Sequence, residues 1–362
     1  MILLIHNKAN SLKRVLYNGT QLENDCETPV KAFWKFAEQY PEELIGWCEQ
    51  DLQKDLPIKN WNEIFFHDLI MASYAVKTTF LPEAIGYIDQ LPFVNVNRNV
   101  NYPTWQMSAD IGGIKAKTLM KFHKTLGDIT DFELLLNSIA KIGQQNGLFC
   151  YSAPGLAKIG GTIPASTAST NQLFAFVYSH YKSLRLLLLF WCFLRYERRF
   201  PMLALLSALF HKKQFRKEND FTGVEIHSSK KTSTGIDMDV IIPTMGRRKY
   251  LLQVMEDLKN QTLLPRKVII VEQNPDPGSQ TDLPELNAGV WPFEIVHHFI
   301  HQTGACNARN LALEEIKSNW VFFADDDNRM EHDTLEKALY EIQKWGVDLL
   351  TLNYRQKGEK LY

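Results

Sequence analysis

The sequence SNWVFFADDDNR, at residues 318–329, runs an apolar segment directly into three consecutive aspartates. The apolar run, residues 320–324, is typical of a buried strand. Three like charges at a strand end repel one another, so they are costly unless water or a cation covers them. The stretch therefore predicts a cation site or a solvated acidic turn. Such a turn would cap the helix expected from Asp333, because aspartate favours helix starts.

The segments before this stretch alternate between strand and helix patterns. Residues 238–247 (MDVIIPTMGR) read as a strand that ends at Pro243 and Thr244, and residues 249–261 have apolar side chains at helical spacing. Later segments repeat the order strand, loop, helix and strand. This alternation predicts an α/β fold with a mainly parallel, doubly wound sheet flanked by helices. Ligands bind such sheets at the carboxyl ends of the strands, where Thr244, Glu272 and the aspartates converge.

Adjacent carboxylates of this kind suit a magnesium or manganese ion. Mg²⁺ and Mn²⁺ prefer hard oxygen ligands and are usually held by one or two carboxylates together with substrate phosphates. An apolar strand that ends in three aspartates therefore indicates a site for a metal and a nucleotide. A metal-dependent phosphohydrolase is an alternative, in which His332 and Asp333 would be further ligands of a two-metal centre.

Three motifs carry a family resemblance: DVIIPTMGRRKYLLQVMEDLKNQTLLPRKVIIVEQ (239–273), TGACNARNLALE (303–314) and WVFFADDDNRMEHDTLEKAL (320–339). Over residues 238–353 they resemble the nucleotide-binding half of family 2 glycosyltransferases with the GT-A fold. The resemblance implies an inverting, metal-dependent hexosyltransferase of polysaccharide biosynthesis, with Mn²⁺ or Mg²⁺ as cofactor. Its donor would be a nucleotide-sugar, UDP-linked before others, and its acceptor a glycan or a lipid-linked glycan. The alternative is a non-catalytic nucleotide-sugar-binding or scaffold protein of a polysaccharide assembly complex.

The resemblance also assigns site residues by position. The donor-binding positions are Pro243, Thr244, Arg247, Glu272, Gly304, Asn307, Arg309, Asn310, Asp325 and Asp326. Glu272 stands where the family usually has an aspartate, and the longer side chain leaves the preferred base open. Asp325 and Asp327 match the outer members of the Asp-x-Asp motif, and the resemblance implies both as metal ligands.

An inverting transfer also needs a base that takes the proton of the acceptor hydroxyl. In the family this base usually lies well after the Asp-x-Asp motif, in the acceptor-binding half. Only 35 residues follow Asp327. Two explanations stay open: the sequence is part of a longer protein, or the acceptor half comes from elsewhere, including residues 1–180.

Residues 1–180 bear a fainter likeness to the same fold. MILLIHN, at residues 1–7, reads as a first strand, and a second strand ends in Glu49-Gln50-Asp51, the place of the Asp-x-Asp motif. By the same likeness, Asp131 or Glu133 falls where the catalytic base of the family would be. The chain would then be two tandem copies of one fold, the first degenerate. The alternative is an unrelated α/β module whose acids are solvated.

A basic and apolar segment at residues 181–217 separates these regions. It holds nine Lys or Arg residues against the single Glu197, a local charge of +8. Its longest apolar run, residues 186–194, is shorter than the roughly 20 residues of a bilayer-spanning helix. Apolar helices with basic flanks suit an anionic membrane surface, so we expect a helical connector that binds there through residues 182–217. The alternative is a buried helical hairpin.

Length and composition set the remaining limits. A chain of 362 residues favours two domains, expected at 1–180 and 237–362 with a polar linker at 218–236. A net charge of −1 gives no argument for nucleic acid as a partner. Five scattered cysteines without a CxxC pair suggest neither a zinc site nor a disulfide framework. With no signal-peptide pattern at the start, we expect a cytoplasmic protein, peripheral on the inner face of the cell membrane.

Overall fold

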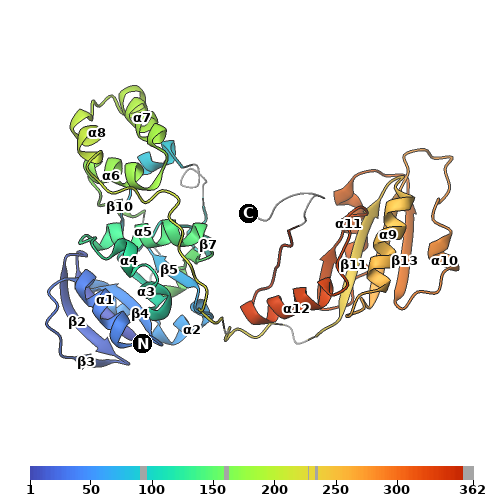
Figure 1. Cartoon of the computed structure of the whole chain (residues 1–362), viewed down its shortest axis with the longest axis horizontal. Helices are drawn as coiled ribbons and strands as arrows, with labels where there is room; N and C mark the ends of the chain where they lie inside the picture. Colours follow the sequence, from blue (N-terminus) through green and yellow to red (C-terminus); the bar gives the residue numbers. More distant parts are fainter. Residues whose placement is uncertain (90–95, 159–162, 227, 233–234, 354–362) are drawn as a thin grey trace. The chain divides into compact units, whose positions relative to one another are not determined.

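The computed structural model describes residues 1–89, 96–158, 163–226, 228–232 and 235–353. The chain divides into two compact units, Met1–Ser229 and Lys230–Tyr362, called here the N-terminal and C-terminal units (Figure 1). The division falls inside residues 218–236, the segment expected to be a linker. The basic and apolar segment at 181–217 is part of the N-terminal unit. The last nine residues of the expected C-terminal domain, 354–362, lie outside the described residues.

The N-terminal unit is built on an eight-stranded mixed sheet in the order β3-β2-β1-β4-β8-β5-β9-β7. Its strands are β1 (Ile2–Asn7), β2 (Ser11–Tyr17), β3 (Thr20–Leu22), β4 (Leu44–Glu49), β5 (Ile70–Tyr74), β7 (Tyr102–Pro103), β8 (Ile111–Lys115) and β9 (Phe149–Ser152). β1 and β4 are parallel, as are β5 and β9, whereas the other neighbours in this sheet are antiparallel. A separate pair joins β6 (Thr78–Thr79) to β10 (Ala165–Ser166). The α/β class is confirmed, and the tandem relation stays a prediction.

The helices of this unit before the hairpin are α1 (Pro29–Gln39), α2 (Trp61–Ile64), α3 (Ala116–Met120), α4 (His123–Leu126), α5 (Phe132–Gln145) and α6 (Thr170–His180). Helices α1, α3 and α5 pack against strands of the sheet, and α6 packs on α5. Local sequence fixes where the longer helices begin. Thr28 caps α1 ahead of a proline, and Ser169 forms a capping box with Gln172 at the start of α6. Edge-to-face contacts among Phe33, Trp47 and Phe132 join α1, β4 and α5 into one core.

Residues 183–210 form a helical hairpin at one end of the N-terminal unit, named here the α7–α8 hairpin (Figure 1). It contains α7 (Ser183–Cys192), a π-helical turn (Phe193–Glu197) and α8 (Met202–Ala208). Both helices pack on α6, and the inward side chains include Leu189, Phe193 and Ala204. Most of the other large apolar side chains of the hairpin are exposed. The hairpin is therefore buried on one side only.

The C-terminal unit contains a four-stranded sheet in the order β13-β12-β11-β14, with all neighbours parallel. Its elements are β11 (Met238–Thr244), α9 (Arg248–Lys259), β12 (Lys267–Gln273), α10 (Glu285–Ala288), β13 (Glu294–Ile300), α11 (Ala305–Leu313), β14 (Trp320–Phe323) and α12 (Thr334–Trp345). The expected parallel sheet flanked by helices is confirmed for this unit.

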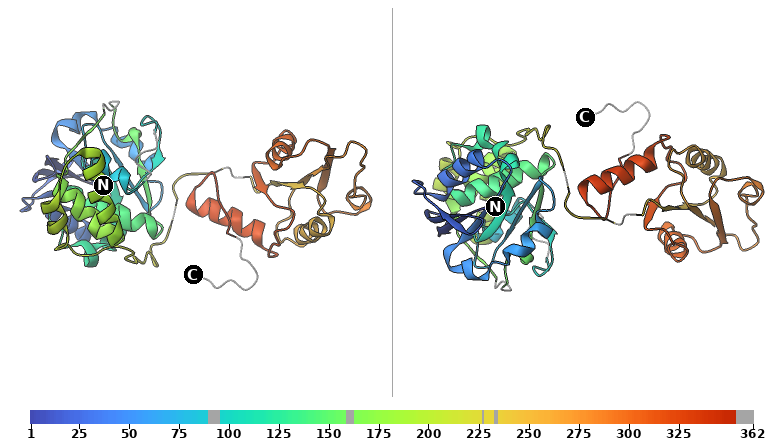
Figure 2. Two further views of the ribbon diagram at one scale, coloured as in Figure 1. Left: turned by 90° about the horizontal axis from the view of Figure 1, so that it is seen from above. Right: turned by 90° about the horizontal axis from the view of Figure 1, so that it is seen from below.

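Side-chain alternation along the central strands gives the C-terminal unit its two layers of helices. Val240 and Ile242 of β11 pack with α9 and α12, whereas Ile241 of the same strand packs with Ala308 and Ala312 of α11. Figure 2 shows α9 and α11 on opposite sides of the strands. Because the centre of the sheet is covered on both faces, β11 and β12 carry apolar runs (residues 240–242 and 268–271), and polar residues follow where these runs end.

Candidate functional site

The carboxyl ends of β11, β12 and β14 lie at one edge of the C-terminal sheet because these strands are parallel. Thr244, at the end of β11, is in register with Glu272, at the end of β12. The three aspartates follow directly after β14 on the other side of β11. The structure therefore brings the predicted donor and metal residues of three strands to one edge, where ligands bind in open α/β sheets.

The middle aspartate of the acidic turn faces inward. Asp326 is 6% exposed, and its carboxylate accepts a hydrogen bond of 2.7 Å from the Thr244 hydroxyl and one of 3.3 Å from Arg247. A buried carboxylate needs such partners, since an unpaired charge in the interior is costly. Asp326 thus joins the end of β11 to the turn after β14 and fixes the direction of its two neighbours.

The outer aspartates face solvent and are each paired with an arginine. The Asp325 side chain is 54% exposed and accepts a 2.8 Å hydrogen bond from Arg309 of α11. The Asp327 side chain is 44% exposed and accepts a 2.5 Å hydrogen bond from Arg247. Asp326 first, and Asp327 with it, raise the pKa of Arg247 by Coulomb attraction and hydrogen bonding. Carboxylates and guanidinium groups therefore alternate along this edge, as binding of a metal and a phosphate together requires.

The carboxylates of the acidic turn suit a hard divalent cation whose remaining ligands come from a bound phosphate. Asp325 and Asp327 supply oxygen atoms from one tight turn, and Mg²⁺ is often held by only two carboxylates plus substrate phosphates. Across the described residues, no group of three or more His, Cys, Asp or Glu side chains is arranged to hold a metal ion. A site of this kind would need phosphate oxygens, which the two arginines would also attract.

Glu272 is held by partners of its own unit. The residue is 6% exposed, and its carboxylate accepts hydrogen bonds from the Thr281 hydroxyl at 2.6 Å and the Asp282 amide at 2.9 Å. A third contact joins it to His297 Nε2 at 3.0 Å. The carboxylate therefore ties the loop after β12 to β13. His297 lies outside the three sequence motifs. Its contact with Glu272 arises from the register of β12 and β13, in which Ile270 lies opposite His297.

The loop before α11 is fixed by a residue outside the assigned set. The Gln273 side-chain amide, 5% exposed, donates to the carbonyls of Gln302 at 2.8 Å and Gly304 at 3.1 Å. Gly304 has φ of +122°, a backbone conformation that favours glycine. Asn307 and Asn310, one turn apart on α11, are exposed. The Gly-x-x-x-Ala-Arg-Asn segment thus starts at a glycine turn anchored to β12, and it presents Arg309 to Asp325.

The two base candidates of the N-terminal unit have different surroundings. Asp131 caps α5 by accepting the Leu134 amide at 3.0 Å, and its other oxygen accepts from Gln172 at 3.0 Å. Both oxygens of the half-buried Glu133 lie within 2.9 Å of the Thr167 hydroxyl. Burial raises the pKa of Glu133 to about 7, although the hydrogen bond from Thr167 acts in the opposite direction. A pKa in this range suits Glu133 to proton exchange near neutral pH.

Further polar groups gather at the carboxyl ends of β1 and β4. His6 lies 3.3 Å from Glu49 and is hydrogen bonded to the Ala109 carbonyl at 2.9 Å. Asp110 is 3% exposed and accepts from the amides of Lys77 and Thr78. Asp110 also raises the pKa of Glu133 by Coulomb repulsion. The acidic segment that begins at Glu49 thus follows the strand parallel to β1, just as the three aspartates follow the strand parallel to β11.

The raised pKa of Glu133 predicts how stability changes with pH. The folded N-terminal unit holds the proton up to about pH 7, whereas the unfolded chain releases it near the ordinary value of 4.5. Stability is therefore fully present below about pH 4.5 and declines as pH rises through about 7. We expect Glu133→Gln to remove this decline, measured as the melting temperature of the N-terminal unit from acidic to mildly alkaline pH. An equal pH dependence in both proteins would contradict the prediction.

Comparison with known proteins places a family match on the C-terminal unit. Residues 239–362 match the family model "Glycosyl transferase family 2". Glycosyltransferase GlyG of Streptococcus pneumoniae is 23% identical over 125 residues, which are 34% of this chain and 40% of GlyG. The minor teichoic acid biosynthesis protein GgaB of Bacillus subtilis is 25% identical over 123 residues, 33% of this chain and 14% of GgaB. The chain thus spans less than half the length of these relatives.

A solved structure also matches part of the chain. The crystal structure of S. aureus TarS 1-349 in complex with UDP is 23% identical, covers 29% of this chain and 32% of that chain, and has a TM-score of 0.26. No helix among the described residues is both long and apolar enough to cross a bilayer.

Proposed function

We propose that this protein transfers a sugar from a nucleotide-sugar donor to an acceptor hydroxyl, because residues 239–362 match the family model of glycosyl transferase family 2. The observation that carries the proposal is the acidic turn, residues 325–327, paired with Arg247 and Arg309 at the carboxyl edge of a parallel sheet. These positions are the ones that the family resemblance assigns to the donor and the metal. We propose an inverting hexosyl transfer, with a UDP-sugar as the first donor to test.

Within the proposed donor site, the buried residues and the arginines have different roles. Asp326 and Thr244 are buried and bonded to each other, so they keep the edge in shape before a ligand arrives. Arg247 and Arg309 carry fixed positive charge to the same place and would bind the diphosphate. Pro243, Asn307 and Asn310 remain proposed donor contacts by position alone.

Asp325 and Asp327 would hold the divalent ion, Mn²⁺ or Mg²⁺, through their exposed oxygens. When bound, the ion stabilises negative charge that develops on the departing nucleoside diphosphate. The two arginines share that task, because each is already placed beside one of the outer carboxylates. The protein therefore offers a preorganised cationic surface, with carboxylates to position the metal.

The proposal extends to the acceptor and the location. GgaB is named for minor teichoic acid biosynthesis, so we propose an acceptor of similar class, a glycan or a lipid-linked glycan. We also propose that the protein works at the inner face of the cell membrane.

The experiment that tests the function uses the purified 362-residue chain with UDP-, GDP- and dTDP-sugars, with and without Mn²⁺. Nucleotide release is followed together with calorimetric binding. Metal-dependent release from one donor supports the transferase. Binding without release would support a non-catalytic nucleotide-sugar-binding protein. Absence of binding to every donor would overturn the assignment of the site.

For the proton acceptor we propose Glu133 in place of Asp131. Glu133→Gln is expected to lower the turnover number at neutral pH by about 100-fold, because proton transfer by a positioned side chain contributes about 10²–10⁴-fold. Asp131→Asn is the matched control, since asparagine caps a helix as well as aspartate does. A pH profile of turnover completes the test: equal profiles in wild type and Glu133→Gln would exclude Glu133 as the base.

A further inference from the structure

Much of the apolar surface of the α7–α8 hairpin is left exposed after the hairpin packs on α6. Its exposed large apolar side chains are Leu184, Leu187, Leu188, Trp191, Tyr196, Phe200, Met202, Leu203, Leu206, Leu209 and Phe210. Three of them are nearly free of contact, with exposed fractions of 74% for Leu184, 80% for Leu203 and 92% for Phe210. Contiguous apolar patches of this kind mark interaction sites on otherwise water-soluble surfaces.

Positive charge is concentrated in the hairpin and in the residues that flank it, and only part of this charge is paired within the unit, as by Lys212 with Asp128 at 3.8 Å. Segment 182–217 holds nine Lys or Arg residues and one Glu, and that Glu197 accepts a hydrogen bond from the Tyr87 hydroxyl at 2.8 Å. Within the described part of the chain, no ion pair involves Arg195, Arg198 or Arg199. These arginines lie at the turn between the two helices, where Arg198 has a left-handed backbone with φ of 53°.

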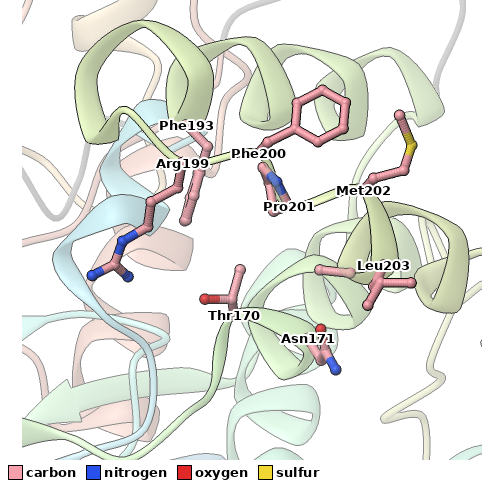
Figure 3. A pocket seen from close by; sticks show the side chains of 9 residues that line it. Thr170, Asn171, Phe193, Arg199, Phe200, Pro201, Met202 and Leu203 are labelled. Atoms are coloured by element: carbon pink, nitrogen blue, oxygen red, sulfur yellow. The ribbon is translucent and has the colours of Figure 1, made fainter.

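A recess of about 470 Å³ opens beside this turn, between the start of α6 and the start of α8. Its walls are largely apolar and include Phe193, Phe200, Met202 and Leu203 (Figure 3). Arg199 lies on one side of the recess, and Thr170 is on the α6 side. The surface therefore combines an apolar hollow with a nearby cation.

We propose that the outward face of the α7–α8 hairpin docks on an anionic lipid bilayer, lying in the headgroup region with its apolar side chains toward the acyl chains. α7 has ten residues and is about 15 Å long, half of the roughly 30 Å hydrocarbon core, so it lies in the surface and does not span it. Trp191 and the arginines of the turn are the residue types that membrane interfaces favour. This inference does not depend on the proposed transferase activity.

Charge decides between a membrane and the other occupants. A second copy of this chain would bring two surfaces of the same positive sign together, and like-charge contact disfavours such a pair. An anionic bilayer supplies the opposite charge over the whole face and an apolar layer directly beneath it. A bilayer therefore satisfies both properties of the hairpin at once.

The test measures partition of the full chain onto vesicles of phosphatidylcholine and phosphatidylglycerol in equal parts, and onto phosphatidylcholine alone. We expect binding to the anionic vesicles that weakens as salt is raised, since salt screens surface charge. An apolar variant carries Trp191→Ser, Leu203→Ser and Phe210→Ser. A charge variant carries Arg195→Gln, Arg198→Gln and Arg199→Gln. Each is expected to lower the partition coefficient by about tenfold or more.

Matched controls change equally exposed residues elsewhere. Ile236→Ser, Val290→Ser and Leu349→Ser match the apolar variant in exposure, and Lys13→Gln, Lys59→Gln and Lys124→Gln match the charge variant. Both controls should bind vesicles as the wild type does, and circular dichroism should show that all four variants are folded. Undiminished partition of both hairpin variants would overturn the proposal. Concentration-dependent dimers that the apolar variant abolishes, without vesicle binding by the wild type, would instead identify a self-association surface.

Discussion

Replacing Asp327 by alanine is expected to abolish Mn²⁺-dependent binding of UDP while the C-terminal unit stays folded. The Asp327 side chain is 44% exposed and is paired with Arg247, which is itself 53% exposed, so its loss removes only a solvent-facing ion pair. The proposed metal would lose one of two protein carboxylates, which leaves too few ligands for a stable site. Turnover of the donor should fall by about 100-fold or more, as it does when one contact to developing charge is removed.

Two further variants make this prediction sharper. Asp325→Ala should have the same effect, because Asp325 is the other exposed carboxylate of the turn. Asp348→Ala removes an exposed aspartate outside the site and should bind nucleotide as the wild type does. Isothermal titration of UDP with and without Mn²⁺ measures all three. Equal Mn²⁺-dependent affinity in wild type and Asp327→Ala would falsify the metal assignment.

Replacing Glu272 by alanine is expected to destabilise the C-terminal unit by about 3 kcal/mol, the cost typical of removing one partner from a buried charged network. The change leaves the Asp282 amide, the Thr281 hydroxyl and His297 without their acceptor. Because the chain has two units, a single unfolding midpoint would mix their stabilities. Hydrogen exchange of the β12 amides reports on the C-terminal unit alone, and its protection should fall by about 100-fold.

Replacing an exposed glutamate serves as the control, because it removes the same charge without disturbing a buried network. Glu256→Ala removes an exposed residue of α9 that pairs only with its own helix, and surface pairs of this kind contribute about 0–1 kcal/mol. If Glu272→Ala keeps full exchange protection but loses UDP binding, the carboxylate contacts the donor directly, as the family resemblance implies. We expect instead that Glu272→Ala lowers exchange protection, and that donor binding weakens only because the loop after β12 is less ordered.

The elements of the C-terminal unit could be predicted from sequence because their signals are local. The apolar runs that end at Thr244 and at Asp325 have the continuous character of strands buried on both faces, and the segment between Arg248 and Lys259 has helical spacing. The N-terminal sheet could not be ordered in the same way. Its short β5, β8 and β9 pair across long separations in sequence, and no local pattern fixes which neighbours meet.

Within the candidate site, the sequence located the residues that gather at this edge of the sheet but not the contacts that each of them makes. All three aspartates look alike in FFADDDNR, yet only Asp326 is buried against Thr244. Glu272 appeared as a donor contact, whereas in the folded unit its carboxylate contacts a histidine 25 residues away. Gln273 was not singled out, although it anchors the loop before α11. Each role depends on side-chain direction and strand register, which are properties of the assembled sheet.

The sequence by itself determined the α/β class, the parallel strands of the C-terminal unit and the acidic turn with its arginines, because strand periodicity, turn residues and charge are written locally along the chain. Only the tertiary structure decided which carboxylates are available to a ligand and which face of the α7–α8 hairpin remains uncovered. The physical reason is that burial is set by contacts between distant segments. The packing of α6 covers Leu189 and leaves Leu203 in solvent, although the two residues are equally apolar.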